Sequence, residues 1–172
     1  MKQLLLYIIT TIFLFSCSSR LETALDSANA NRAELEKVLE HFKNDKNPLK
    51  YEAAVFLIEN MQHQYTYHGE AVDKLDKLYL STSTVSLNKR TEFFNNHATE
   101  LLSKGSLHPS FDINGIKADY LIKAIDDACE VWCRTPWHEE YDKSVFFEYV
   151  LPYRLDHEPL SDWRNAVSNE FP

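Results

Sequence analysis

Two cysteines, Cys129 and Cys133, have the side chains most able to do chemistry, and they are four residues apart. Four residues make about one turn of an α-helix, so both thiols are predicted to lie on one helix face. A disulfide at this spacing is close to the upper limit of Cα separation and has poorly aimed Cβ atoms. We therefore interpret the pair mainly as small buried apolar residues, with a disulfide, a metal site or a nucleophile as open alternatives.

Cys133, His138 and Asp142 have the residue types of a nucleophile, a base and an orienting acid. They lie within ten residues of one another, whereas thiol enzymes usually recruit their base from a distant segment. A solvated polar loop is the favoured interpretation, and the sequence predicts no catalytic residue.

The other polar groups do not form a recognisable site. The chain has seven histidines, and His63 and His68 share a segment that lacks metal-ligand spacing. The adjacent carboxylates at 126–127 and 139–140 point in different directions, as neighbours do on a helix, and are predicted to be solvated. We expect no metal and no cofactor.

Residues 132–164 contain all three tryptophans and three prolines, so aromatic packing and chain turns coincide there. In the favoured interpretation this segment closes the core. In the other it lines a binding groove, because tryptophan and arginine are typical of binding hot spots. The candidate groove residues are Trp132, Trp137, Tyr153, Arg154, Trp163 and Arg164.

The chain has 172 residues, 44% hydrophobic and 26% charged, which is the composition of one folded globular domain. Its formal net charge of −8 disfavours binding to nucleic acid. With only 3 glycines, a β-sandwich or barrel with many tight turns is disfavoured as well.

The first 16 residues have the pattern of a secretory signal, with Lys2 followed by an apolar run from Leu4 to Phe15. The run ends at Ser16-Cys17, which resembles the lipobox of bacterial lipoproteins. That resemblance implies a lipid on Cys17, a membrane as partner, and a place in the cell envelope, in the outer membrane rather than the inner. An ordinary secretory signal is the alternative.

The mature chain is predicted to be all-α, an irregular bundle of six or seven helices with aromatic-rich loops. Residues 17–30 form a tether with a first short helix, and residues 31–172 form the helical domain. Asn31 and Glu34 suggest a capping box, and Asn47-Pro48 suggests an N-cap with proline in the first turn. Segments 63–68 and 107–115 are predicted to be loops. Helices are expected over 32–42, 48–61, 70–80, 88–104 and 116–133, over a short segment that is capped by Asp142 or Ser144 and runs through Val150, and over 159–169.

Five segments resemble the N-terminal helical region of Bacteroidetes-type exported lipoproteins that carry a C-terminal transglutaminase-like, papain-fold domain. The most specific are 148–154, Glu-Tyr-Val-Leu-Pro-Tyr-Arg, and 158–164, Glu-Pro-Leu-Ser-Asp-Trp-Arg. The others are 31–41, 54–61 and 132–137. The resemblance implies that the catalytic Cys, His and Asp belong to the later domain, and no residue of this chain matches those positions.

Three hypotheses follow. In the first, the protein is a membrane-anchored, non-catalytic helical module that binds or positions a polypeptide or glycan partner at the envelope. In the second, it is a truncated transglutaminase-like thiol enzyme whose catalytic domain is missing from this chain. In the third, it binds a small molecule or carbohydrate through its tryptophans.

Overall fold

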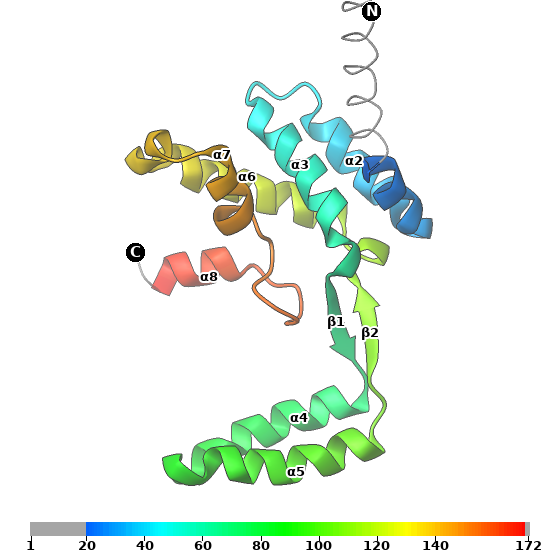
Figure 1. Ribbon diagram of the computed structural model, residues 1–172, viewed down its shortest axis with the longest axis vertical. Helices are drawn as coiled ribbons and strands as arrows, with labels where there is room; N and C mark the ends of the chain where they lie inside the picture. Colours follow the sequence, from blue (N-terminus) through cyan, green and yellow to red (C-terminus); the bar gives the residue numbers. More distant parts are fainter. Residues whose placement is uncertain (1–19, 171–172) are drawn as a thin grey trace, which may run out of the picture. The chain divides into compact units, whose positions relative to one another are not determined.

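The computed structural model describes residues 20–170, which are predominantly α-helical with one small sheet of two strands (Figure 1). This confirms the predicted all-α, irregular fold. The chain forms two compact units: unit 1 combines the described residues up to Gln64 with those from Phe111 onward, and unit 2 is Tyr65–Ser110. The predicted signal at 1–16 and Cys17 lie outside the described residues. Within residues 20–170, no helix has both the length and the apolar character needed to cross a membrane.

Three helices that pack against one another build unit 1: α2 (Arg32–Phe42), α3 (Pro48–Asn60) and α6 (Ala118–Arg134). A helix over residues 20–27 and the 3-10 turn η1 (Asn29–Asn31) precede them. Each helix has apolar residues three or four positions apart, so one face of each is buried. The largest fully buried side chains of this core are Phe42, Phe146, Leu35, Ile58, Met61, Leu121, Ile125 and Leu151.

The bounds of α2 were predicted to the residue, whereas α3 ends one residue earlier than predicted. Of the two caps predicted for these helices, only one is present. Asn47 caps α3, because its side-chain oxygen accepts a hydrogen bond from the backbone N–H of Leu49 at 3.1 Å. The capping box at Asn31 is wrong. The Asn31 side chain is buried and donates instead to the carbonyls of Ile113 and Ile116, at 3.1 and 2.9 Å.

The chain after α6 turns through short helical pieces. These are the 3-10 helix η6 (Pro136–Glu140), α7 (Lys143–Val145) and the π-helix η7 (Phe146–Val150). An irregular segment then leads to α8 (Trp163–Glu170). The predicted start of this last helix at Pro159 is therefore wrong by four residues. Glu158 accepts hydrogen bonds from the N–H groups of Leu155 and Asp156, which closes a turn where a helix start was expected.

Unit 2 is an antiparallel pair of helices that lies, in the sequence, between two short strands. Strand β1 (Tyr65–His68) leads into α4 (Glu70–Ser81), and α5 (Arg90–Lys104) returns to β2 (His108–Phe111). The turns η3 (Thr82–Thr84) and η4 (Leu87–Lys89) join the helices. The predicted loops at 63–68 and 107–115 are therefore wrong in part. Each four-residue strand exists only through pairing with a segment about 40 positions away, which no local pattern reports.

Gly69 makes the junction between β1 and α4 possible. Its φ is +128°, a conformation that residues with a side chain rarely adopt. A Cβ atom at this position would lie 2.3 Å from the carbonyl oxygen of Ser106, which itself accepts a hydrogen bond from Ala71 N–H. The close backbone contact holds the start of α4 against the end of α5.

Candidate functional site

A buried group of three side chains joins the segment that follows β2 to the segment that follows the π-helix. Arg154 donates to one oxygen of the Asp112 carboxylate and Tyr153 donates to the other, each at 2.8 Å. The side chains of Asp112 and Arg154 are each 4% exposed. Burial raises the pKa of Asp112, and the hydrogen bonds from Tyr153 and Arg154 oppose that rise. Burial also raises the pKa of Tyr153, with a further contribution from the neighbouring carboxylate. The Tyr153 hydroxyl therefore keeps its proton and donates a hydrogen bond to the carboxylate as a neutral group.

The backbone between the π-helix and α8 is held by Arg164 and Trp163. Arg164 donates to the carbonyls of Val150 and Pro152, both at 2.6 Å, and so satisfies groups left open where the π-helix ends. The indole N–H of Trp163 donates to the Tyr153 carbonyl at 3.1 Å. The Arg164 guanidinium lies 4.7 Å from the centre of the Trp163 ring, a cation–π contact. These two residues fix the loop that carries Tyr153.

A pocket of about 270 Å³ lies between α3 and this loop. Its apolar wall includes Phe56 and Phe147, whose rings stack with centres 5.0 Å apart and planes at 28°. The side chains of Asn60, Gln64 and Glu148 add amide and carboxylate groups. The remaining lining residues are Leu57, Met61, Pro152, Tyr153, Arg154 and Leu155.

The pocket is suited to one residue of a larger ligand. Sites for whole drug-sized molecules have volumes of about 300–1,000 Å³, so this one is at the lower limit. Two of its lining residues, Phe147 and Glu148, belong to a π-helix, a conformation that occurs frequently at functional sites. The buried ion pair between Asp112 and Arg154, together with the hydrogen bond from Tyr153 to Asp112, fixes the positions of Tyr153 and Arg154 in the pocket lining. We take this pocket as the candidate binding site.

The structure brings together four of the six predicted groove residues. Tyr153 lines this pocket with Arg154, and it also lines a smaller neighbouring pocket with Trp163 and Arg164. Trp132 and Trp137 line neither. Sequence reasoning missed the α3 side of the site, because Phe56, Asn60 and Gln64 read as ordinary helix and loop positions.

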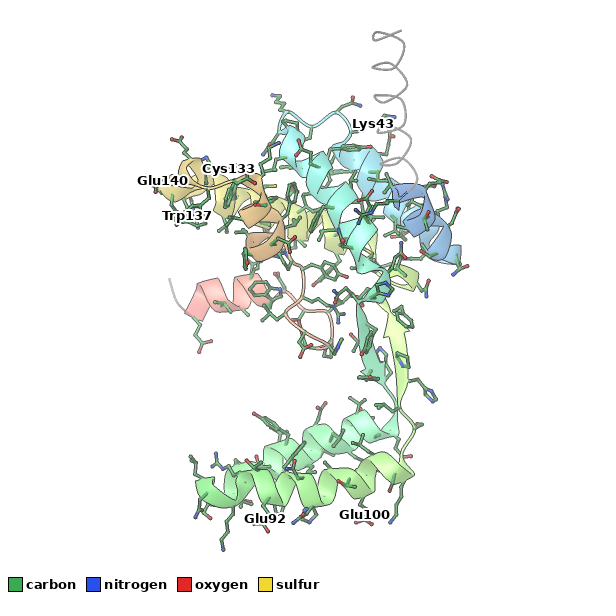
Figure 2. The ribbon with its side chains drawn as sticks, viewed as in Figure 1. Lys43, Glu92, Glu100, Cys133, Trp137 and Glu140 are labelled. Atoms are coloured by element: carbon green, nitrogen blue, oxygen red, sulfur yellow. The ribbon has the colours of Figure 1, made fainter. Side chains whose placement is uncertain are left out.

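Trp132 and Trp137 belong to a separate aromatic cluster at the end of α6. Trp132 is 5% exposed, and its ring lies 5.3 Å from that of Trp137 and 5.5 Å from that of Phe146. It is a core residue, as the favoured interpretation predicted. Trp137 is 40% exposed and packs edge-on against Tyr141. Figure 2 shows Trp137 near Cys133 and Glu140.

The side chains of the possible Cys–His–Asp set have separate structural roles. The His138 ring donates from Nδ1 to the Thr135 carbonyl at 2.6 Å. Asp142 caps α7 by accepting from Ser144 N–H at 2.8 Å. Among the described residues, no hydrogen bond links His138 to Cys133 or to Asp142. The three side chains therefore do not form a triad in this structure.

Cys129 and Cys133 are free thiols with very different environments. Cys129 is buried, as predicted, but the prediction of a buried Cys133 is wrong, because its side chain is exposed near the end of α6. Burial raises the pKa of Cys129 to about 12, with a smaller contribution from nearby Cys133. Both residues border a depression beside Lys50, whose ammonium group donates to Asp126 at 2.7 Å. In residues 20–170, no group of three or more His, Cys, Asp or Glu side chains is arranged to hold a metal ion.

Comparisons of the chain with protein-family models, with curated proteins and with solved structures found no match.

Proposed function

We propose that this protein is a membrane-anchored, non-catalytic helical module of the cell envelope. It binds a polypeptide or glycan partner by holding one residue of that partner in the pocket between α3 and the π-helix. The observation that supports this best is the pocket itself, which combines a stacked phenylalanine pair with amide and carboxylate groups. An apolar surface with a few placed polar groups is the usual composition of a ligand site.

The sequence resemblance supports the same site. Segment 148–154 is among the most specific parts of the resemblance to the helical region of transglutaminase-like lipoproteins. Four residues of that segment, together with Leu155, form one side of the pocket: Glu148, Pro152, Tyr153 and Arg154. In this proposal the segment forms a recognition surface, and any reaction on the bound partner is carried out by a separate, catalytic domain.

Binding can be tested by calorimetry with two sets of probes. One set is peptides from digested envelope proteins, and the other is oligosaccharide fragments of envelope glycans. Phe147→Ala removes half of the stacked pair and should weaken binding at least about tenfold, as expected for an aromatic hot spot. Tyr149→Ala, on the same π-helix but 82% exposed, is the matched control and should leave affinity unchanged. If neither the peptides nor the oligosaccharides bind saturably, the proposal is wrong.

A second variant separates a loss of binding from a loss of stability, which Phe147→Ala could also cause. Gln64→Ala removes a polar group of the pocket wall without removing core volume. It should weaken binding while the thermal unfolding midpoint stays near that of the parent protein. Equal binding by the parent, Phe147→Ala and Gln64→Ala proteins would place the ligand elsewhere.

The membrane anchor is tested separately. If Cys17 carries the lipid, Cys17→Ala should be exported yet move from the membrane to the soluble fraction, because two or more acyl chains provide stable anchoring. Unchanged fractionation of the exported variant would contradict the anchor. Ser18→Ala, the next residue along, is the control.

A further inference from the structure

The α4–α5 hairpin of unit 2 has almost no hydrophobic core of its own. Every residue of Tyr65–Ser110 is described, and the buried helical positions are two alanines, Ala71 and Ala98. The large apolar side chains of the hairpin remain half-buried or exposed. Those that recur along one side of each helix are Val72, Leu75, Leu78, Tyr79, Phe93, Phe94, Leu101 and Leu102, while Leu80 on α4 and Leu87 in the connection are 71% and 81% exposed.

These side chains occupy one stripe on each helix. On α4 they recur three or four residues apart from Val72 to Tyr79, and Tyr79 is still 69% exposed. On α5 the opposite side is polar, and Glu92 and Glu100 project from it away from α4 (Figure 2). Two such helices side by side form one apolar face that their mutual contact covers only in part. A surface of this kind marks an interaction site.

We propose that this face binds the same face of a second copy of the chain and forms a four-helix bundle about a two-fold axis. Antiparallel helix pairs with short connections are the halves from which such bundles are built. A two-fold contact requires only that the face complement itself. It would supply the core that unit 2 lacks.

The charge distribution favours a second copy over another partner. The whole chain has a formal net charge of −8, yet residues 65–110 have five acidic and five basic side chains and a formal net charge of zero. Two copies can therefore meet at the hairpin without local repulsion. Acidic residues exceed basic ones by one in α4, and basic exceed acidic by one over 87–104. If the two-fold axis is parallel to the helices, α4 lies opposite α5 of the second copy. The slightly acidic α4 then faces the slightly basic segment 87–104, so their charges are complementary.

The size of the face fits a reversible dimer. At 1.5 Å per residue α4 and α5 are about 18 and 22 Å long, and neighbouring helices lie about 8–10 Å apart. Contact over that face would bury on the order of 1,000 Å² in total, the lower limit for specific interfaces. We therefore expect a reversible dimer whose fraction increases with protein concentration.

Sedimentation equilibrium of the full chain in density-matched detergent tests the association. We expect a monomer–dimer equilibrium, and Tyr79→Glu should raise its dissociation constant at least about tenfold. Tyr149→Glu makes the same change at an exposed tyrosine of unit 1 and should leave the constant unchanged. A parent protein that stays monomeric at all concentrations, or equal effects of the two variants, would overturn the proposal.

Cross-linking of the unmodified protein locates the contact without relying on a variant. A mixture of ¹⁴N and ¹⁵N chains is treated with an amine-reactive cross-linker, and mixed-isotope peptides identify links between copies. Links among Lys74, Lys77 and Lys89 are expected, whereas Lys43 of unit 1, which is exposed, is the control and should form none. Intermolecular links confined to unit 1 would show that the dimer uses another surface.

Discussion

The carboxylate of Asp112 accepts a hydrogen bond from Arg154 at 2.8 Å, although the two residues are 42 positions apart in the chain. Both side chains are 4% exposed. The carboxylate also accepts from Tyr153, so both of its oxygens are satisfied. This pair ties the segment that follows β2 to the segment that follows the π-helix, and thereby sets one side of the candidate pocket.

Removing one member of this pair should be severely destabilising. Asp112→Ala leaves the Arg154 charge buried without its carboxylate, which typically costs about 3–5 kcal/mol. Urea denaturation with matched m-values measures the loss. Lys143→Ala, which breaks the exposed pair with Glu52, is the control and should cost less than about 1 kcal/mol. A loss at Asp112 no larger than that of the control would contradict the structural role of the pair.

Asn31 provides a test between a capping role and the observed one. A cap needs only an acceptor, so Asn31→Asp would preserve it. In the structure the amide donates to the carbonyls of Ile113 and Ile116, and a carboxylate cannot do so. Asn31→Asp should therefore lower the free energy of unfolding by at least about 2 kcal/mol, since it buries a charge and leaves acceptors unpaired. Parental stability of this variant would restore the capping interpretation.

The two thiols should react at very different rates. At pH 8 Cys129 is protonated, because its folded-state pKa is raised to about 12, and it is also buried. The thiolate is the reactive form, so iodoacetamide should modify exposed Cys133 first and Cys129 only on unfolding. Peptide mapping by mass spectrometry follows both sites. Equal labelling of the two under native conditions would contradict the buried position of Cys129, and equal labelling in urea is the control.

Arg164 is predicted to control the order of the loop that forms the pocket. Arg164→Ala removes the donor to the carbonyls of Val150 and Pro152. Amide hydrogen exchange over 150–162 should accelerate at least about tenfold, because local opening becomes easier. Arg134→Ala changes an exposed arginine on α6 and should leave this exchange unchanged. Unaltered protection in Arg164→Ala would mean that the loop is held by other contacts.

Local patterns predicted most of the helices well. Apolar spacing indicated α2, α3 and α6, and Asn47-Pro48 indicated the start of α3, because such signals depend on neighbours within one or two turns. The same patterns could not show that Asn31 is recruited by the turn before α6, or that Glu158 delays the last helix. The partners of Asn31 lie more than 80 positions along the chain, and the turn at Glu158 is a local hydrogen-bonded turn that apolar spacing does not report.

The candidate site also has one side that could be predicted from the sequence and one side that could not. Its loop side was visible in the sequence, since one aromatic, proline-rich segment contains Tyr153 and Arg154, which line the pocket, and Trp163 and Arg164, which hold the loop. Its helix side was not, because Phe56 is an ordinary apolar helix position until Phe147 stacks on it.

By itself the sequence determined the helical class and the buried faces of the helices, because 3.6-residue periodicity is a property of the chain. Only the tertiary structure decided which polar groups meet. It placed Asp112 against Arg154, paired β1 with β2, and left the α4–α5 hairpin without a core. The physical reason is that burial and hydrogen bonding between distant segments depend on packing in space, which local periodicity does not encode.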